Sequence, residues 1–300
     1  MIQGLPEEEL FTAGNNACAG CGPATVLRHA IRAAGKNTIV VGATGCMEVV
    51  STLYPFTSWK VPYIHGAFEN SAAIASGIDS ALKQLNKRDK VNILVIAGDG
   101  ATFDIGLQAI SGAIERQHRF CYICYDNGAY MNTGIQRSGA TPPYAATTTS
   151  PAGKKIHGKQ EQKKNMPLIV AAHGSYVYVA TASLAHIHDF INKVKKGLAH
   201  KGPSYIQVFA PCPTGWNYPT NMTVEMARLA YQAKITPIYE IENGKLKFTM
   251  KPDKTIPVKK YLSPQRRFKH LNDKEIKDIQ KIINESYKKL ENLEKCNNIF

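Results

Sequence analysis

Short apolar runs rich in β-branched and aromatic residues alternate with helical stretches along the first 235 residues. The runs lie at residues 37–45, 91–100, 120–127, 176–182 and 204–212. Each is almost continuously apolar, as expected of strands that are buried on both faces of a sheet. The predicted helices between them cover residues 23–34, 70–85, 105–116 and 184–200. Strands that alternate with helices predict an α/β fold, in which a mostly parallel sheet carries helices on both faces.

The pattern changes after residue 235. Asn243 and Gly244 stand between two alternating runs, which predicts a β-hairpin. Further on, apolar residues recur at helical spacing in a charged segment, with Asn272 or Asp273 as the expected helix cap. The apolar positions are Ile276, Ile279, Ile283, Leu290 and Leu293. We therefore predict an α/β domain over residues 1–235 and a C-terminal extension, a hairpin plus a helix, over residues 236–300.

The length and composition are those of a globular protein. The chain has 300 residues, of which 44% are apolar, enough for a sizeable core. The seven cysteines are an odd number, and residues 1–14 lack the basic start and apolar core of a secretion signal. The apolar runs are shorter than the roughly 20 residues that span a bilayer. We expect a soluble cytoplasmic protein with reduced thiols and no membrane association.

The formal net charge of +14 raises the question of an acidic partner. Lysines concentrate at residues 152–165 and after Lys245, with few aromatic residues between them. Nucleic-acid-binding surfaces usually combine basic clusters with a recognisable motif, and none is found here. A solvated lysine-rich face is the preferred interpretation and an acidic protein partner the second. We expect no binding of nucleic acid.

Two CxxC pairs occur in different settings. Cys18 and Cys21 precede a predicted helix, where a loop can turn both sulfurs to the same side. Cys121 and Cys124 lie within a predicted strand. Because side chains alternate between the faces of a strand, these two sulfurs point apart and cannot share one metal. We therefore expect Cys121 and Cys124 to be buried structural residues.

Cys46 and Cys212 are the better partners for the first pair. Each lies in a loop flanked by Gly or Pro, directly after a predicted strand. Parallel strands end at one edge of the sheet, where such folds place their ligands, so the four thiols are expected to converge there. Four thiolates hold either a cubane iron–sulfur cluster or a structural zinc ion, and the spacing alone leaves both open. Cys296, in the charged tail, is expected to be incidental.

The segment "GDGATFDIG" (98–106) follows the second predicted strand. Gly98, Asp99 and Gly100 at a helix start let backbone N–H groups approach a diphosphate, while the carboxylate holds a hard cation. The next strand is followed by "YDNGAYMNTGIQ" (125–136), which offers Asn127 and a backbone carbonyl near Ala129 as oxygen ligands. These oxygens, two diphosphate oxygens and water would complete an octahedron around Mg²⁺. A GDG followed by Asn is typical of thiamin diphosphate sites.

Together these segments resemble the β subunits of the pyruvate:ferredoxin oxidoreductase (pyruvate synthase) family. The resemblance runs from "CAGCG" through "GATGCMEVVSTLYPF", "GDGATFDIGLQAISGAIER", "YDNGAYMNTGIQRSGATPPYAATTTSP" and "APCPTGW" to "RFKHL" near residue 270. It implies a thiamin diphosphate-binding fold and a [4Fe–4S] cluster close to the thiamin ring. In single-chain relatives a Glu follows the CxxCG and contacts thiamin, whereas this chain has Pro23 there, so that contact is not expected.

The resemblance also implies the roles of individual residues. Asn132 would lie beside the reactive ring and Cys46 would touch both cofactors, which makes these two the expected catalytic residues. The cluster ligands would be Cys18, Cys21, Cys46 and Cys212. The Mg²⁺ ligands would be Asp99, Asn127 and the carbonyl of Ala129, and the diphosphate would face Gly98, Asp99, Gly100 and Ala101.

The activity implied is the oxidative decarboxylation of pyruvate with CoA to acetyl-CoA and CO2. The electrons would pass singly through the cluster and onward to ferredoxin. The resemblance implies α, γ and δ partner subunits, with the α subunit supplying the carboxylate that activates thiamin. Two alternatives remain open: the same chemistry on another 2-oxoacid, such as 2-oxoisovalerate, an aryl 2-oxoacid or oxalate, and a non-catalytic zinc-binding module with a basic face.

Overall fold

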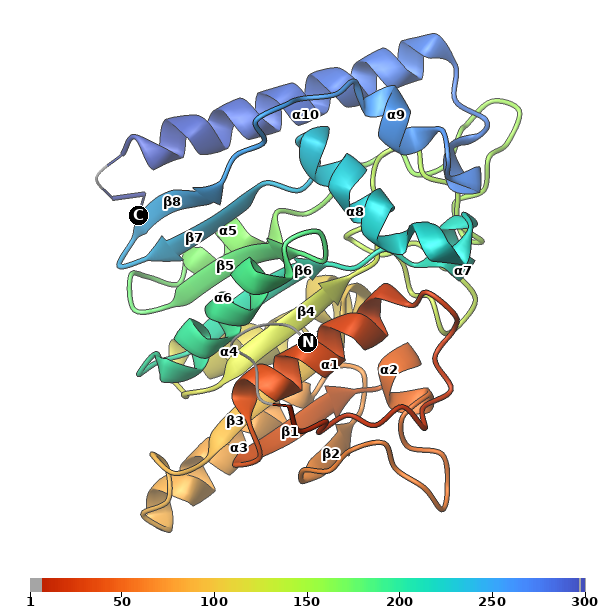
Figure 1. The fold of residues 1–300 in the computed structure, drawn as a ribbon. Helices are drawn as coiled ribbons and strands as arrows, with labels where there is room; N and C mark the ends of the chain where they lie inside the picture. The colour runs from red at the N-terminus through yellow and green to blue at the C-terminus, as the bar shows by residue number, and fades with distance from the viewer. Residues whose placement is uncertain (1–6, 297, 300) are drawn as a thin grey trace.

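Eight strands form one twisted sheet in the computed structural model, which describes residues 7–296, 298 and 299 (Figure 1). The strand order is β2-β1-β3-β4-β6-β5-β7-β8, and β1 to β6 run parallel. The strands are β1 (Thr38–Ala43), β2 (Tyr63–Gly66), β3 (Asn92–Gly98), β4 (Cys121–Asp126), β5 (Tyr178–Ser183), β6 (Ser204–Phe209), β7 (Ile238–Glu242) and β8 (Lys245–Met250). The five predicted α/β strands are confirmed. Strand β2 was not predicted, because it is a short, partly exposed edge strand without a buried apolar run.

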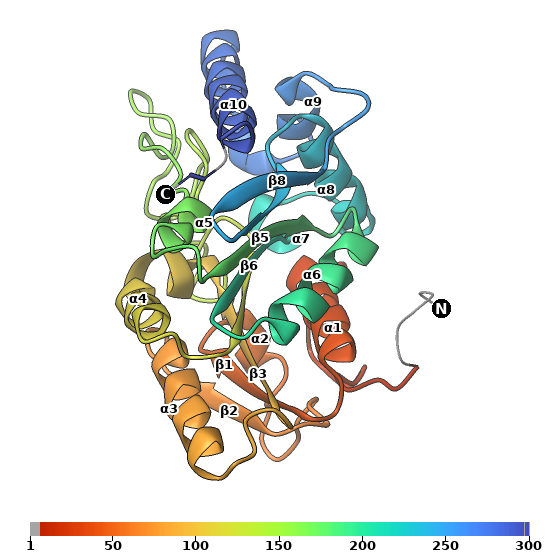
Figure 2. The ribbon, with the colours of Figure 1, turned by 90° about the vertical axis from the view of Figure 1, so that its left-hand side faces the viewer.

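Helices cover both faces of the sheet (Figure 2). One face carries α1 (Gly22–Ala34), α6 (Ile187–Ala199) and α8 (Thr223–Gln232), and the other carries α3 (Ser71–Gln84), α4 (Leu107–Glu115) and α5 (Met166–Ala171). The sheet separates two hydrophobic cores, one beneath α1, α6 and α8 and the other beneath α3, α4 and α5. Within β4, Cys121 packs in the former core and Cys124 in the latter, and both are fully buried. The predicted fold class and the placement of these two thiols on opposite faces are therefore confirmed.

Several helix boundaries differ from the prediction. The segment after β3 begins as a π-helical turn, η1 (Ala101–Ile105), and α4 starts only at Leu107. Helices α5 and α8 were not predicted, because α5 spans less than two turns and α8 has no side-chain cap at Met222 to mark its start. The remaining short elements are α2 (Cys46–Val49), α7 (Pro213–Trp216), η2 (Thr220–Met222), α9 (Val258–Leu262) and η3 (Arg266–Phe268).

The C-terminal segment continues the same sheet. Asn243 and Gly244 both have positive φ angles, 52° and 72°, as the two-residue turn of a tight hairpin requires. Strand β7 pairs antiparallel with β5. Helix α10 (Asp273–Glu294) starts with a capping box formed by Asn272 and Glu275, and Figure 1 shows it lying along this edge of the sheet. The predicted boundary at residue 235 thus separates two segments of chain that share one sheet.

None of the helices in the described part of the chain is long and apolar enough to cross a bilayer.

Candidate active site

A hollow at the carboxyl ends of the parallel strands collects the predicted cofactor residues. It is lined by the turns that follow β1, β3 and β4 and encloses about 30 Å³. That is room for a water molecule or two, so a larger ligand would extend over its open rim. The predicted residues on its wall are Cys46, Gly98, Asp99, Gly100, Ala101, Asn127, Ala129 and Asn132.

Three oxygen-bearing groups, which we call the oxygen cluster, converge in this hollow: the Asp99 carboxylate, the Asn127 amide and the carbonyl of Ala129. In the orientation that satisfies its hydrogen bonds, the Asn127 NH2 group donates to the carbonyl oxygen of Ala129 at 2.9 Å and to Oδ1 of Asp99 at 2.8 Å. Turning the amide over would present its oxygen to the same two acceptors, an arrangement that a hard cation between them would stabilise.

Asp99 is completely buried at the end of β3. Its Oδ1 accepts a hydrogen bond from the backbone N–H of Asn127 at 3.2 Å, and its Oδ2 accepts one from the hydroxyl of Ser138. Burial raises the pKa of the Asp99 carboxyl, and the nearby carboxylate of Asp126 raises it further. Asp126 is itself paired with Lys163. A buried carboxylate in such a setting is stabilised by a cation at its free lone pairs.

The loop after β4 is held against Asp99 by lysines that turn inward. The ammonium of Lys159, whose side chain is only 1% exposed, donates to the carbonyl of Thr141 at 2.7 Å. Lys164 pairs with Asp104 at 2.8 Å, and Lys163 pairs with Asp126. The interpretation of residues 152–165 as a solvated lysine-rich face is therefore wrong for Lys159 and Lys163, whereas the side chain of Lys164 is 42% exposed. A charge run does not reveal which of its members meet buried acceptors.

Sequence reasoning missed the aromatic side chains of the hollow. The rings of Phe68 and Tyr130 lie 5.6 Å apart on its wall, and the Tyr130 hydroxyl donates to the carbonyl of Gly100 at 3.1 Å. A Cβ atom on Gly100 would lie 2.4 Å from the Tyr130 ring, so only glycine fits there. Ser138 was also missed, because nothing in a loop sequence shows that a hydroxyl will meet a carboxylate 39 residues away.

The four predicted cluster cysteines come from three loops, two of which are joined by a hydrogen bond. The N–H of Gly22 donates to the carbonyl of Pro211 at 3.2 Å, and the hydroxyl of Thr223 donates to the carbonyl of Gly20 at 2.5 Å. These bonds place the loop with Cys18 and Cys21 against the loop with Cys212. Gly20 has a φ angle of +71°, and a Cβ atom there would lie 2.0 Å from a backbone oxygen, so this close approach requires glycine.

Cys21, Cys46 and Cys212 are partly buried and Cys18 is exposed, and the four thiols are close enough to influence one another. Burial, with smaller contributions from the charges of Cys212, Cys46 and Cys18, raises the pKa of Cys21 to about 12. Burial likewise raises the pKa of Cys46 to about 11, with Cys212 and Cys18 contributing. Across the described residues, no three His, Cys, Asp or Glu side chains form the compact arrangement of a single-ion site.

A tryptophan connects the thiol loops to the oxygen cluster. The indole N–H of Trp216, four residues after Cys212, donates to the carbonyl of Asn127 at 2.7 Å. The guanidinium of Arg267 lies 3.8 Å from the centre of the Trp216 ring. Trp216 therefore links the thiol loops and the oxygen cluster into one site.

Comparison with known proteins identifies the family. Residues 43–208 match the model of the thiamine pyrophosphate enzyme, C-terminal TPP-binding domain. The chain is 54% identical to the pyruvate synthase subunit PorB of Methanocaldococcus jannaschii, over 97% of this chain and 99% of that protein. It is 45% identical to the ketoisovalerate oxidoreductase subunit VorB of Pyrococcus abyssi, over 96% and 94% of the two chains.

The chain belongs to the 2-oxoacid:ferredoxin oxidoreductase family. It is a thiamin diphosphate-binding subunit of an oxidoreductase that acts together with other subunits. A solved structure, that of the 2-oxoglutarate:ferredoxin oxidoreductase from Magnetococcus marinus, has the same fold with a TM-score of 0.58 and 22% identity, covering 76% of this chain and 81% of the other. The family predicted from the sequence motifs is confirmed.

Proposed function

We propose that this chain is the β subunit of a pyruvate:ferredoxin oxidoreductase, which converts pyruvate and CoA to acetyl-CoA and CO2 and passes two electrons to ferredoxin. The observation that carries the proposal is the pairing of an oxygen cluster with four thiols at one end of the sheet. Both groups occur in a chain that is 54% identical to a pyruvate synthase subunit.

The oxygen cluster fits Mg²⁺. Adjacent ligands of an octahedral site with bonds of 2.0–2.1 Å lie about 2.9 Å apart. The Asn127 NH2 group donates to the Ala129 carbonyl and Asp99 Oδ1 at 2.9 and 2.8 Å, so turning this amide over would bring three oxygens to that spacing. Asp99, Asn127 and the carbonyl of Ala129 would hold the ion, and Gly98 to Ala101 would offer their backbone to the diphosphate.

The thiol group fits a [4Fe–4S] cluster better than zinc. A cubane presents one iron at each of four corners, so its thiolates stand farther apart than those around a single ion. Burial raises the pKa of the Cys21 and Cys46 thiols, so both are protonated at neutral pH before a cluster binds. Cluster assembly would displace their protons, which makes it dependent on pH. Cys18, Cys21, Cys46 and Cys212 would be the ligands.

The roles of the remaining residues follow from their positions. When bound, thiamin diphosphate supplies the carbon nucleophile for decarboxylation of a 2-oxoacid, and the cluster takes up electrons one at a time. Asn132 is exposed on the wall of the hollow, where its amide is available to hydrogen-bond to the substrate. Cys46 lines the same hollow and neighbours the other thiols, so it joins the two cofactor sites.

Electron transfer beyond the first cluster requires partner subunits. The sequence contains seven cysteines, and four are assigned to the first cluster. Cys121 and Cys124 point to opposite faces of the sheet, which leaves too few thiols for another four-cysteine cluster. We assign the onward clusters to a δ subunit and the remaining substrate and CoA contacts to α and γ subunits, with ferredoxin as the final acceptor.

An anaerobic assay of the co-expressed subunits with a panel of 2-oxoacids tests the proposal. We expect the highest kcat/KM with pyruvate, measured as CoA-dependent reduction of a viologen dye. The second candidate substrate is 2-oxoisovalerate, which the 45% identity to a ketoisovalerate oxidoreductase subunit favours. A higher kcat/KM for 2-oxoisovalerate or oxalate would overturn the assignment to pyruvate, and iron-free, colourless protein would overturn the cluster.

A further inference from the structure

A second, larger cavity lies between α10 and the sheet, and it shares no lining residue with the hollow around Asp99. Its volume is about 240 Å³. An apolar cavity of about 150 Å³ is enough to hold benzene. Apolar side chains of α10 and the end of β6 form one wall, among them Ile279, Ile283 and Phe209. The space is therefore suited to a small apolar group.

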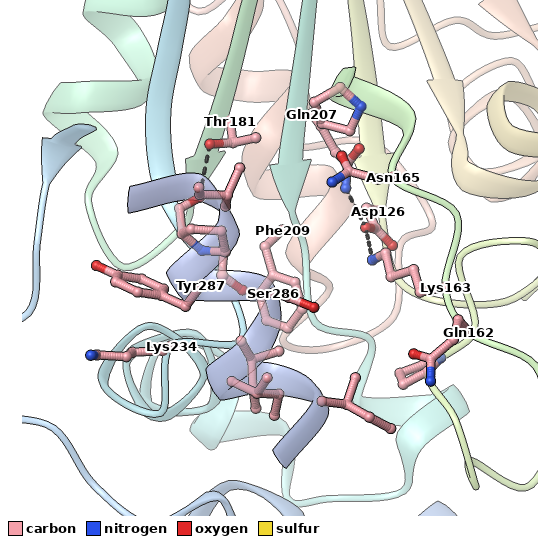
Figure 3. A pocket seen from close by; sticks show the side chains of 18 of the residues that line it. Asp126, Gln162, Lys163, Asn165, Thr181, Gln207, Phe209, Lys234, Ser286 and Tyr287 are labelled. Atoms are coloured by element: carbon pink, nitrogen blue, oxygen red, sulfur yellow. Dashed lines mark hydrogen bonds and ion pairs between the residues drawn. The ribbon is translucent and has the colours of Figure 1, made fainter. Parts of the chain in front are cut away.

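The polar side of this cavity is occupied by residues that bind one another. Figure 3 shows Gln207 and Lys163 converging on Asp126. The Gln207 amide donates to Asp126 at 2.8 Å, and Lys163 forms an ion pair with it. These groups neutralise each other, so this side offers a ligand no net charge.

The opposite side carries a cation that has no acidic partner. Figure 3 shows the hydroxyl of Tyr287 and the ammonium of Lys234 extending to the same side of α10. The Lys234 Nζ lies 4.5 Å from the centre of the Tyr287 ring. Among the described residues, no carboxylate pairs with this lysine. Both residues line the cavity, so an anionic group there would meet an ammonium and a phenol hydroxyl.

The backbone holds Lys234 in this position. Lys234 follows α8 with a φ angle of 60°, a left-handed conformation that glycine adopts with less strain than other residues. Its N–H donates to the carbonyl of Tyr231 at 3.0 Å. The side chain is therefore anchored at its base and directed over Tyr287.

We propose that the cavity under α10 binds a small carboxylate with an apolar body. The carboxylate would contact Lys234 and Tyr287, and the body would pack against Ile279, Ile283 and Phe209. The charges of the lining residues agree with this choice: Lys163 is paired with Asp126 and Lys164 with Asp104, which leaves Lys234 as the lining cation available to an anionic ligand. An amine ligand would be repelled. The site is independent of the proposed thiamin site.

Hexanoate and its neutral analogue hexanamide are suitable probes, with binding measured by calorimetry on the full chain. We expect hexanoate to bind more tightly than hexanamide. Lys234→Met keeps the packing on Tyr287 and should weaken hexanoate binding about tenfold while leaving hexanamide unchanged. Lys281→Met is the matched control, because Lys281 lies on α10 outside the cavity with its side chain 75% exposed.

A second pair of variants tests the location. Ser286 lines the cavity and is exposed, so Ser286→Trp should block it without disturbing the core and abolish the binding of both probes. Glu285→Trp, one residue away and outside the cavity, should bind both normally. Asp99→Ala should also leave hexanoate binding unchanged, which separates this proposal from the proposed function.

Four results would overturn the proposal. They are the absence of saturable hexanoate binding, equal affinity for hexanamide, binding that survives Ser286→Trp, and exclusion of hexanoate from the assembled enzyme. The last would mean that a segment of a partner subunit fills the cavity instead.

Discussion

Asp99 contributes both charge and geometry to the proposed cation site. Its carboxylate is completely buried, and Asp126 adds a second negative charge close by. Such a group is costly without a cation, so the residue is better suited to ligand binding than to stability. Ser138 and the N–H of Asn127 occupy one lone pair on each oxygen and fix the direction of the others.

We predict that Asp99→Ala abolishes Mg²⁺-dependent binding of thiamin diphosphate, because the ion loses its one anionic protein ligand. The visible spectrum of the cluster should survive, since no thiol is altered. Fluorescence titration with the cofactor measures the first effect. Asp89→Ala is the control, because the Asp89 side chain is 78% exposed and outside the site. Unchanged cofactor affinity in Asp99→Ala would refute the assignment.

Ser138→Ala should weaken cofactor binding by about tenfold without abolishing it, because the carboxylate remains but loses a charge-assisted hydrogen bond. Ser138→Thr retains the hydroxyl and should recover part of the affinity. The Kd for thiamin diphosphate at saturating Mg²⁺ is the measurement. Equal Kd values for the native protein and Ser138→Ala would show that Asp99 does not depend on this hydrogen bond.

At the scale of elements, the position of a cysteine in a loop or a strand decides its role. Loops after β1 and β6 and before α1 bring Cys46, Cys212 and the first CxxC pair together. The β4 backbone sends Cys121 and Cys124 into separate cores.

We expect Cys46→Ser and Cys212→Ser each to lose or distort the cluster, whereas Cys124→Ser keeps its full iron content. Iron analysis and visible absorbance after anaerobic reconstitution measure this. Equal iron loss in all three variants would contradict the distinction between loop and strand.

The loop between β4 and α5 depends on the buried ammonium of Lys159. Its three acceptors are the carbonyls of Gly139, Thr141 and Gln162, at 3.5, 2.7 and 3.3 Å. Burial lowers the pKa of Lys159 to about 8. An unfolded lysine titrates near 10.4, so between about pH 8 and 10.4 the unfolded chain binds more protons at this residue and its contribution to stability rises with pH.

The free energy of unfolding of the native protein, relative to Lys159→Met, should therefore increase by about 1–3 kcal/mol from pH 7.5 to 10. Lys154→Met, at an exposed position of the same loop, should show no such change. Urea unfolding at each pH measures the difference. A difference that stays flat would mean that Lys159 keeps an ordinary pKa in the folded chain.

At the scale of the whole molecule, the proposed function makes the hollow one half of a site that a partner subunit completes. Thiamin is activated by a carboxylate that bonds to its aminopyrimidine ring. We assign none of the acidic residues in the described part of the chain to that role. Glu48 accepts a hydrogen bond from Thr52 at 2.9 Å, Glu69 is exposed at the start of α3, and Asp99 is assigned to the metal.

The isolated, cluster-loaded chain should therefore bind thiamin diphosphate weakly and show no CoA-dependent dye reduction with any 2-oxoacid. Adding the α, γ and δ subunits should restore turnover, because the missing carboxylate and the onward clusters are then present. Turnover by the lone chain would show that the activating carboxylate lies within it.

Local pattern determined much of this protein. Apolar runs alternating with helical stretches were enough to predict the parallel sheet, because burial on both faces requires such strands. Once the strands are parallel, the residues after them must meet at one edge, which placed Cys46, Asp99, Asn127 and Cys212 together. The Asn243–Gly244 turn and the Asn272 cap were also predictable, since both depend on neighbouring residues alone.

Tertiary structure decided the rest. The inward turn of Lys159 and Lys163, the hydrogen bond from Ser138 to Asp99 and the cavity under α10 all depend on contacts between distant parts of the chain. A loop sequence specifies donors and charges but not its path, and the path is chosen by the buried acceptors that it must satisfy. Those acceptors exist only after the sheet and its helices have packed.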